Sequence, residues 1–245
     1  MLAIFKSTVA YGPEELRFPT GEISPSPDLK KSSSALLRSF LDALPQSISV
    51  TMEDMATMAF THSNQSLFRP RSFAVKDDCF CLFEGTLENL PGLRQQYGLS
   101  KSVNEVLFVI EAYKTFRDRA PYPASQMVGH LQGQFAFVIF DRCTGTVFTA
   151  TDSNGKIPLY WGITADGCLA FSDEAELLKA ACGKSLASFP QGCFYSSALG
   201  LRSYEYPKNR VMGIPNMDGE LCGTAFQVEH ENMQVDHEKM SASMV

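Results

Sequence analysis

Four apolar segments separated by short turns constrain the fold more than any other feature of this sequence. The turns between the first three are Asp141 to Gly145 and Ser153-Asn154-Gly155. This spacing is typical of consecutive β-strands. Asp173 follows the last segment and Glu176 stands three residues later, which predicts a capping box at the start of a helix. The segments are residues 132–141, 145–152, 157–162 and 167–172.

The rest of the chain also groups its strands together, with helices between the groups. A hairpin is predicted around Asp77-Asp78 and another around Gly200. Grouped strands predict an α+β fold of two mainly antiparallel sheets with helices outside, because parallel βαβ units would alternate strand and helix. Helices are predicted over 34–44, 102–116 and 174–181, a short helix or turn over 89–98, and strands over 1–5, 47–52, 55–62, 72–85, 192–197 and 200–206.

Composition excludes several classes of function. The net charge is −6 and no basic cluster is present, which argues against a nucleic-acid partner. No apolar run approaches 18 residues, so no membrane span is expected, and the N-terminus does not resemble a signal peptide. We therefore expect a cytoplasmic protein, in one domain over residues 1–227, followed by a disordered polar tail over 228–245.

The seven cysteines predict neither a disulfide framework nor a metal site. Their number is odd, their spacings are irregular and no CxxC pair occurs. The four histidines are not spaced with them as zinc ligands. We expect reduced thiols, no metal and no cofactor, since the sequence also lacks a glycine-rich phosphate loop.

The apolar segments carry a family resemblance. Their pattern resembles the glutaminase domain of asparagine synthetase and other class II glutamine amidotransferases, and the opening residues 1–5 and the stretch 83–89 fit the same pattern. The resemblance implies an N-terminal-nucleophile fold, a four-layer αββα sandwich. The matching residues are Leu131, Gly133, Phe135, Ala136, Phe137, Asp152, Gly155, Pro158, Leu159, Tyr160, Gly162, Ser172 and Leu177.

A second resemblance covers essentially the whole chain. Tyr97-Gly98-Leu99 and Phe116-Arg117-Asp118-Arg119 resemble the YGL and LRDR motifs of the plant aluminium-induced proteins, with Phe116 in place of Leu. This family resemblance implies a plant protein of the stress or hormone response, cytoplasmic or also nuclear. It implies no molecular activity.

The amidotransferase resemblance implies a pocket that has lost its chemistry. Leu2 stands where the family has its nucleophilic Cys, and Ala3 stands at the neighbouring Gly. Glu84 replaces the Asn that donates to the oxyanion, while Gly85 is kept, with a tight turn as its structural reading. The Asp that holds the substrate ammonium becomes Val103, or Asn104 if the alignment shifts by one. We expect a non-catalytic protein, with Leu2, Phe83 and Val103 making this pocket apolar.

Two alternatives keep catalysis open. Cleavage near Lys6 would expose Ser7 or Thr8 as a terminal nucleophile, and Cys79 or Cys81 would act with His62 as base. In either case the chain is a hydrolase, or an amidotransferase that works through a partner subunit.

The preferred reading is a self-assembling or ligand-binding protein. Arg117, Asp118 and Arg119 form either a solvated helix end or a subunit contact. Aromatic residues of the late hairpin, Phe194, Tyr195, Tyr204 and Tyr206, are of the types enriched at interfaces. We therefore expect a homo-oligomer, with an unidentified small-molecule ligand in the old pocket.

Overall fold

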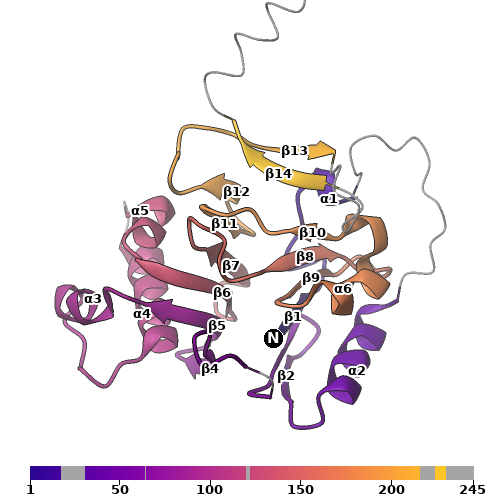
Figure 1. Ribbon diagram of the computed structural model, residues 1–245, viewed down its shortest axis with the longest axis horizontal. Helices are drawn as coiled ribbons and strands as arrows, with labels where there is room; N and C mark the ends of the chain where they lie inside the picture. The colour runs from indigo at the N-terminus through magenta and orange to yellow at the C-terminus, as the bar shows by residue number, and fades with distance from the viewer. Residues whose placement is uncertain (18–30, 64, 120–121, 216–223, 230–245) are drawn as a thin grey trace, which may run out of the picture.

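Two six-stranded antiparallel sheets lie face to face, and helices cover their outer faces (Figure 1). The computed structural model describes residues 1–17, 31–63, 65–119, 122–215 and 224–229. The first sheet has the order β10-β8-β9-β1-β3-β2 and the second the order β12-β11-β7-β6-β5-β4. This arrangement confirms the αββα sandwich.

The strands of the first sheet come from the two ends of the domain. β1 lies between β9 and β3, so the first strand of the chain occupies the middle of the sheet. Helices α2 (Ser33–Ala43) and α6 (Ala175–Cys182) cover its outer face. The strands are β1 (Leu2–Phe5), β2 (Ile48–Met52), β3 (Ala56–Phe60), β8 (Tyr160–Ile163), β9 (Leu169–Ser172) and β10 (Ala187–Ser188).

The second sheet is covered by three helices. These are α3 (Leu90–Gln96), α4 (Glu105–Asp118) and α5 (Ala124–Gly129). Outside both sheets lie α1 (Glu14–Arg17), the short 3₁₀ helix η1 (Gly183–Ser185) and a small ribbon of β13 (Val211–Pro215) and β14 (Thr224–Val228). The strands are β4 (Arg71–Lys76), β5 (Cys79–Leu87), β6 (Gly133–Asp141), β7 (Thr146–Thr151), β11 (Cys193–Ser196) and β12 (Gly200–Ser203).

Three apolar clusters fill the three interfaces between the four layers. In β1, Ala3 and Phe5 face the second sheet, whereas Leu2 and Ile4 face α2 and α6. This split follows from the alternation of side chains along a strand. In β5 the same alternation places Phe80 and Leu82 between the sheets, and Cys79, Cys81 and Phe83 under α4.

Most of the predicted elements are confirmed, and the exceptions are informative. The hairpin turn at Asp77-Asp78 has both residues at positive φ, 49° and 59°. The predicted capping box is wrong: α6 has Glu174 as its N-cap without a side-chain hydrogen bond, because Asp173 binds other groups. The elements α1, α5, η1, β10 and the β13–β14 ribbon were not predicted from the sequence. Residues 230–245 of the predicted tail lie outside the described residues.

Candidate functional site

Four charged groups meet at one end of the layer between the sheets. The first sheet supplies the α-amino group of Met1 and the carboxylate of Asp173, which are 2.5 Å apart. The second sheet supplies Arg71, whose Nε is 2.9 Å from Asp173 Oδ2 and 3.5 Å from Glu84 Oε2. All four groups are at least about nine-tenths buried. We call them the charge cluster; it contains two cations and two carboxyl groups.

Strand register brings these groups together. Leu2 lies opposite Ser172 in the β1–β9 pair, so the residues next to them, Met1 and Asp173, are neighbours. Arg71 lies opposite Glu84 in the β4–β5 pair. The alternation of β5 turns Glu84 toward the first sheet, on the same face as Leu82. The charge cluster therefore bridges the two sheets.

The charge cluster perturbs the protonation of Glu84. Burial raises the pKa of Glu84 to about 7, and the nearby carboxylate of Asp173 adds to this, against the opposing effect of Arg71 and the Met1 amino group. Arg71 Nε, Glu84 Oε2 and Asp173 Oδ2 are buried without a hydrogen bond of good geometry among the described residues. The fold therefore favours the protonated form of Glu84 more than solvent does.

Leu2 lies on the opposite side of the first sheet from the charge cluster. Its side chain is fully buried and packs with Leu36, Phe40 and Ala170 under the helices α2 and α6. Ala3, at the next position, faces the second sheet. Leu2, Phe83 and Val103 were expected to line one apolar pocket together. The structure separates them, because Phe83 and Val103 belong to the cluster beneath α4.

Gly85 is required by a close approach of two backbones rather than by a turn. It lies within β5 at φ 113°, and a Cβ there would be 1.9 Å from the carbonyl oxygen of Gln134 in β6. The prediction that Gly85 lies in a tight turn is therefore wrong. Its neighbour Glu84 remains part of the charge cluster.

Val103 and Asn104 lie at the start of helix α4. Asn104 is the N-cap, and its side chain accepts a hydrogen bond of 3.2 Å from the backbone N–H of Leu107. The carbonyl of Val103 accepts a 2.5 Å hydrogen bond from Arg94 Nε. Neither side chain joins the charge cluster through an interaction between described residues. Sequence reasoning missed Arg71 altogether and assigned Asp173 to a cap.

The alternative nucleophiles have unfavourable surroundings. Burial raises the pKa of Cys79 to about 12 and raises that of Cys81 well above its ordinary value. Both thiols therefore stay protonated at neutral pH, and the thiol is a poor nucleophile. His62 packs edge-on against Phe60, with ring centroids 4.6 Å apart. Within the described ranges no group of three or more His, Cys, Asp or Glu residues is arranged to hold a metal ion.

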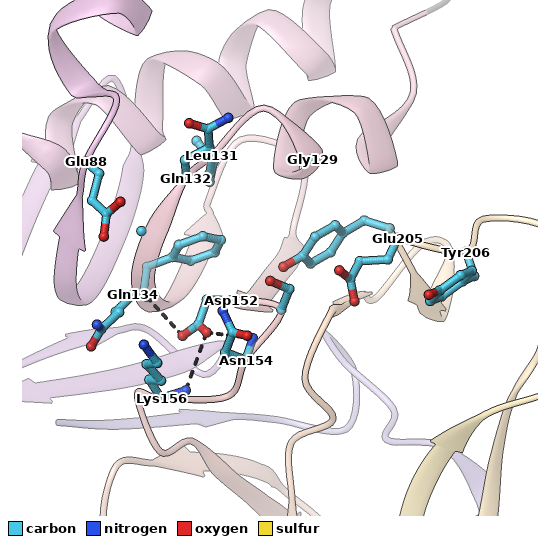
Figure 2. Close-up of a pocket in the computed structure, with 14 residues that line it drawn as sticks. Glu88, Gly129, Leu131, Gln132, Gln134, Asp152, Asn154, Lys156, Glu205 and Tyr206 are labelled. Carbon is cyan, nitrogen blue, oxygen red and sulfur yellow. Dashed lines mark hydrogen bonds between the residues drawn. The ribbon is translucent and has the colours of Figure 1, made fainter.

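A cavity of about 600 Å³ lies at the ends of β5 and β6, outside the charge cluster. Figure 2 shows Glu205 at one side of it and Glu88 and Lys156 at the other, with Asp152 and Asn154 between them. We call it the polar cavity. None of the residues that the sequence assigned to the old amidotransferase pocket lines it, although Asp152 and Gly133 of the family pattern and the aromatic Tyr204 and Tyr206 do.

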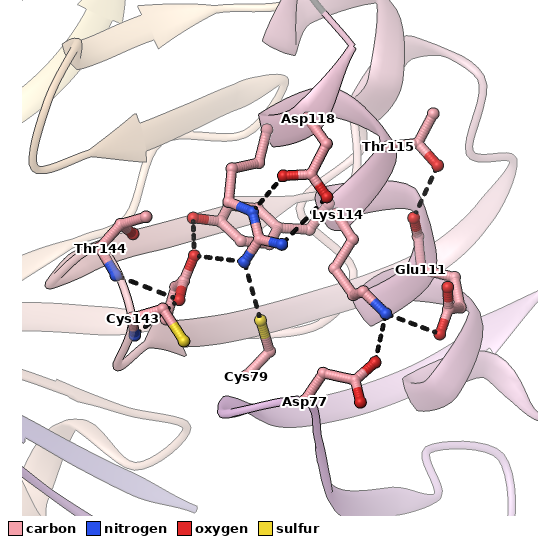
Figure 3. Close-up of polar contacts among 11 residues, drawn as sticks. Asp77, Cys79, Glu111, Lys114, Thr115, Asp118, Cys143 and Thr144 are labelled. Atoms are coloured by element: carbon pink, nitrogen blue, oxygen red, sulfur yellow. Dashed lines mark hydrogen bonds and ion pairs between the residues drawn. The ribbon is translucent and has the colours of Figure 1, made fainter.

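The Arg117–Arg119 segment is engaged within one chain. Arg117 Nε donates to Asp118 at 2.6 Å, and its Nη1 donates to the fully buried Asp141 at 3.0 Å. Figure 3 shows the neighbouring Lys114 reaching both Asp77 and Glu111. Arg119 is exposed at the end of α4. Arg117 is therefore bound within the chain rather than solvated, whereas Asp118 and Arg119 are exposed at the end of the helix.

Two of the aromatic residues assigned to an interface lie in the core. Phe194 and Tyr195 are each 2% exposed, whereas Tyr206 is 48% exposed. Tyr204 is partly buried and donates to the carbonyl of Thr151 at 2.9 Å. The expectation that Phe194 and Tyr195 present a surface to a partner is therefore wrong.

Comparison with known proteins assigns the sequence to a family. The family model described as aluminium induced protein matches residues 2–228. The chain belongs to this family. A stem-specific protein of Nicotiana tabacum, TSJT1, is 39% identical over 150 residues, which cover 61% of this chain and 99% of that protein. No helix in the described part of the chain is long and apolar enough to cross a bilayer.

The aluminium-induced chain is also similar to part of the asparagine synthetases. It is 40% identical over 92 residues to a glutamine-hydrolysing enzyme of Oryza sativa, covering 37% of this chain and 15% of that enzyme. The match to asparagine synthetase B of Escherichia coli is 29% identical over 126 residues, covering 49% and 21%. The chain thus spans about a fifth or less of these enzymes. Among solved structures, a glutamine aminotransferase class-II domain protein from Silicibacter pomeroyi has a TM-score of 0.43 at 12% identity, covering 82% and 88%.

Proposed function

We propose that this chain is a binding protein with an amidotransferase-like fold that does not hydrolyse glutamine. The observation that carries the proposal is Leu2. Its side chain is fully buried beneath α2 and α6, at the position where the resemblance puts the nucleophile. A hydrocarbon side chain has no lone pair with which to attack an amide, so no thioester forms there.

The charge cluster supports the same conclusion. An amidotransferase pocket needs hydrogen-bond donors aimed at a developing oxyanion. Here the groups at that end of the sheets are paired with one another: Arg71 with Asp173 and Glu84, and Asp173 with the Met1 amino group. Glu84 donates a hydrogen bond only in its neutral form, which burial favours and the Arg71 cation opposes, so it is not a permanent donor as the amide of an Asn would be. Substrate would have to break buried ion pairs to enter.

The role of the protein is a further part of the proposal. The family description refers to induction by aluminium, and we propose a binding or assembly role within such a stress response, with self-association of the chain. Leu67 and Phe68 support self-association, because they are 95% and 86% exposed, next to one another, on the loop before β4.

Ammonia release from glutamine tests the loss of catalysis. Purified protein should release no more ammonia than a buffer control, while Escherichia coli asparagine synthetase B, a glutamine-hydrolysing relative, serves as the positive control. Release that rises in proportion to the concentration of this protein would contradict the proposal. Leu2→Cys should also stay inactive, because residue 2 faces the helices and not the charge cluster.

A further inference from the structure

The polar cavity has charged side chains that the fold itself does not use. Glu88, Lys156 and Glu205 line it, and none of the three makes an ion pair or a side-chain hydrogen bond with another described residue. They come from three separate segments, which follow β5, β7 and β12. Its volume of about 600 Å³ lies within the range of small-molecule sites, about 300–1,000 Å³.

The floor of the polar cavity is held rigid. Asp152 is 1% exposed, and its carboxylate accepts hydrogen bonds from the backbone N–H groups of Phe135, Asn154 and Lys156 at 3.2, 2.9 and 3.4 Å. These bonds fix the loop that carries Lys156. Gly133 has φ 137°, and a Cβ there would be 2.2 Å from the carbonyl oxygen of Thr86. A side chain is therefore excluded at Gly133.

The arrangement of charge narrows the class of ligand. Among the described residues that line the polar cavity, Lys156 is the cation, while Glu88, Glu205 and the buried Asp152 are acidic. An excess of carboxylates repels phosphorylated metabolites. A ligand with one carboxylate and one ammonium fits better, because Figure 2 shows Lys156 and Glu205 at opposite sides of the cavity.

Three of the remaining lining residues carry side-chain amides, which suit a ligand that contains peptide groups. Gln132, Gln134 and Asn154 each offer a donor and an acceptor in the geometry of a peptide group. The volume of the cavity, about 600 Å³, exceeds what one amino acid would fill. We propose that the polar cavity binds a short zwitterionic peptide, its carboxylate on Lys156 and its ammonium on Glu205. This inference rests on the proposed binding role and gives it a site away from the charge cluster.

Calorimetry with defined peptides tests the proposal. The probe is alanyl-glycyl-alanine at pH 7, compared with its N-acetylated form, its C-terminal amide and free alanine. We expect the free tripeptide to bind at least tenfold more tightly than any of the other three. Absence of tripeptide binding at millimolar concentration, or equal binding of the acetylated form, would overturn the proposal. The ammonia assay is independent, so failure here leaves the loss of catalysis standing.

Variants of the charged lining residues test whether the tripeptide binds in the polar cavity. Lys156→Met and Glu205→Gln should each weaken tripeptide binding at least tenfold, since each removes one charge partner. Lys179→Met is the matched control, because Lys179 pairs with Glu176 on α6 and does not line the polar cavity. Amide chemical shifts of Gln134, Asn154 and Lys156 should move on titration. Binding that survives both cavity variants, or shifts confined to other residues, would place the ligand elsewhere and refute the site.

Discussion

At the scale of single residues, the two neighbours Glu84 and Gly85 behave differently. Glu84 lies where the resemblance puts an oxyanion donor, and the fold uses it in a buried set of charges. Gly85 is present because β5 and β6 approach too closely for a side chain. Retention of a glycine from the amidotransferase pattern therefore has a purely structural cause, and it carries no information about catalysis.

Glu84 should make stability depend on pH. Its pKa is raised in the folded state to about 7, from an ordinary value of 4.5, so the folded protein binds more protons than the unfolded chain between these values. The free energy of unfolding should therefore fall as pH rises from about 5 to 8. Glu84→Gln removes this titration. The melting temperature of the variant should therefore rise relative to that of the wild type as pH increases over this range. Glu174→Gln, at an exposed residue, is the control; a pH-independent difference for Glu84→Gln would argue against the buried titration.

Gly85 should tolerate no larger residue. Gly85→Ala places a Cβ 1.9 Å from the Gln134 carbonyl oxygen at a φ of 113°, and we expect a loss of about 2–4 kcal/mol in the free energy of unfolding. Gly145→Ala is a matched control: it also has positive φ, 65°, but its Cβ would meet no atom within 4 Å, so about 1–2 kcal/mol is expected. Denaturant titration measures both. Equal losses would show that the close contact does not matter.

At the scale of elements, local patterns predicted the strands and long helices well. Alternation identifies β5 to β7, and helical spacing identifies α2 and α4, because each pattern depends on nearby residues alone. The charge cluster was not predictable in this way: Met1 meets Asp173 from 172 positions away, through the register of β1 and β9. The capping box failed for the same reason, since a distant amino group and Arg71 bind Asp173.

Helix α4 provides a prediction at this scale. Arg117 joins the end of α4 to Asp141 of β6, and Asp141 is fully buried. Arg117→Met leaves that carboxylate with Tyr113 and two backbone N–H groups but without its cation, so about 1–3 kcal/mol of stability should be lost. Arg119→Met, at the exposed neighbouring position, should change stability by less than about 0.5 kcal/mol. The reverse order in an unfolding titration would favour a surface role for Arg117.

At the scale of the whole molecule, the four layers enclose a complete apolar core. Apolar clusters fill every interface between its layers, and Leu2 is part of one of them. The position at which the resemblance implies the nucleophile is thus occupied by a core side chain. This packing agrees with the proposed binding role, because a fold by itself does not imply a reaction.

Self-association is predicted at the same scale. Light scattering should give a defined mass above the 27.0 kDa of one chain. Replacing the exposed Leu67 and Phe68 by serine should return the mass to that of one chain, because the pair contributes apolar area to the contact. Arg119→Met serves as a surface control that leaves the mass unchanged. A mass of 27.0 kDa for the wild type across micromolar concentrations would reject self-association.

The absence of a glutamine-directed nucleophile is tested most directly by intact-mass spectrometry after incubation with an alkylating diazo-ketone analogue of glutamine. Such a compound binds as glutamine does and then forms a covalent bond with the attacking atom, so it reports Leu2, the cysteines and any exposed terminal residue together. The account predicts an unmodified chain of 27.0 kDa, apart from labelling that excess glutamine does not prevent. One analogue added per chain, and blocked by excess glutamine, would contradict it.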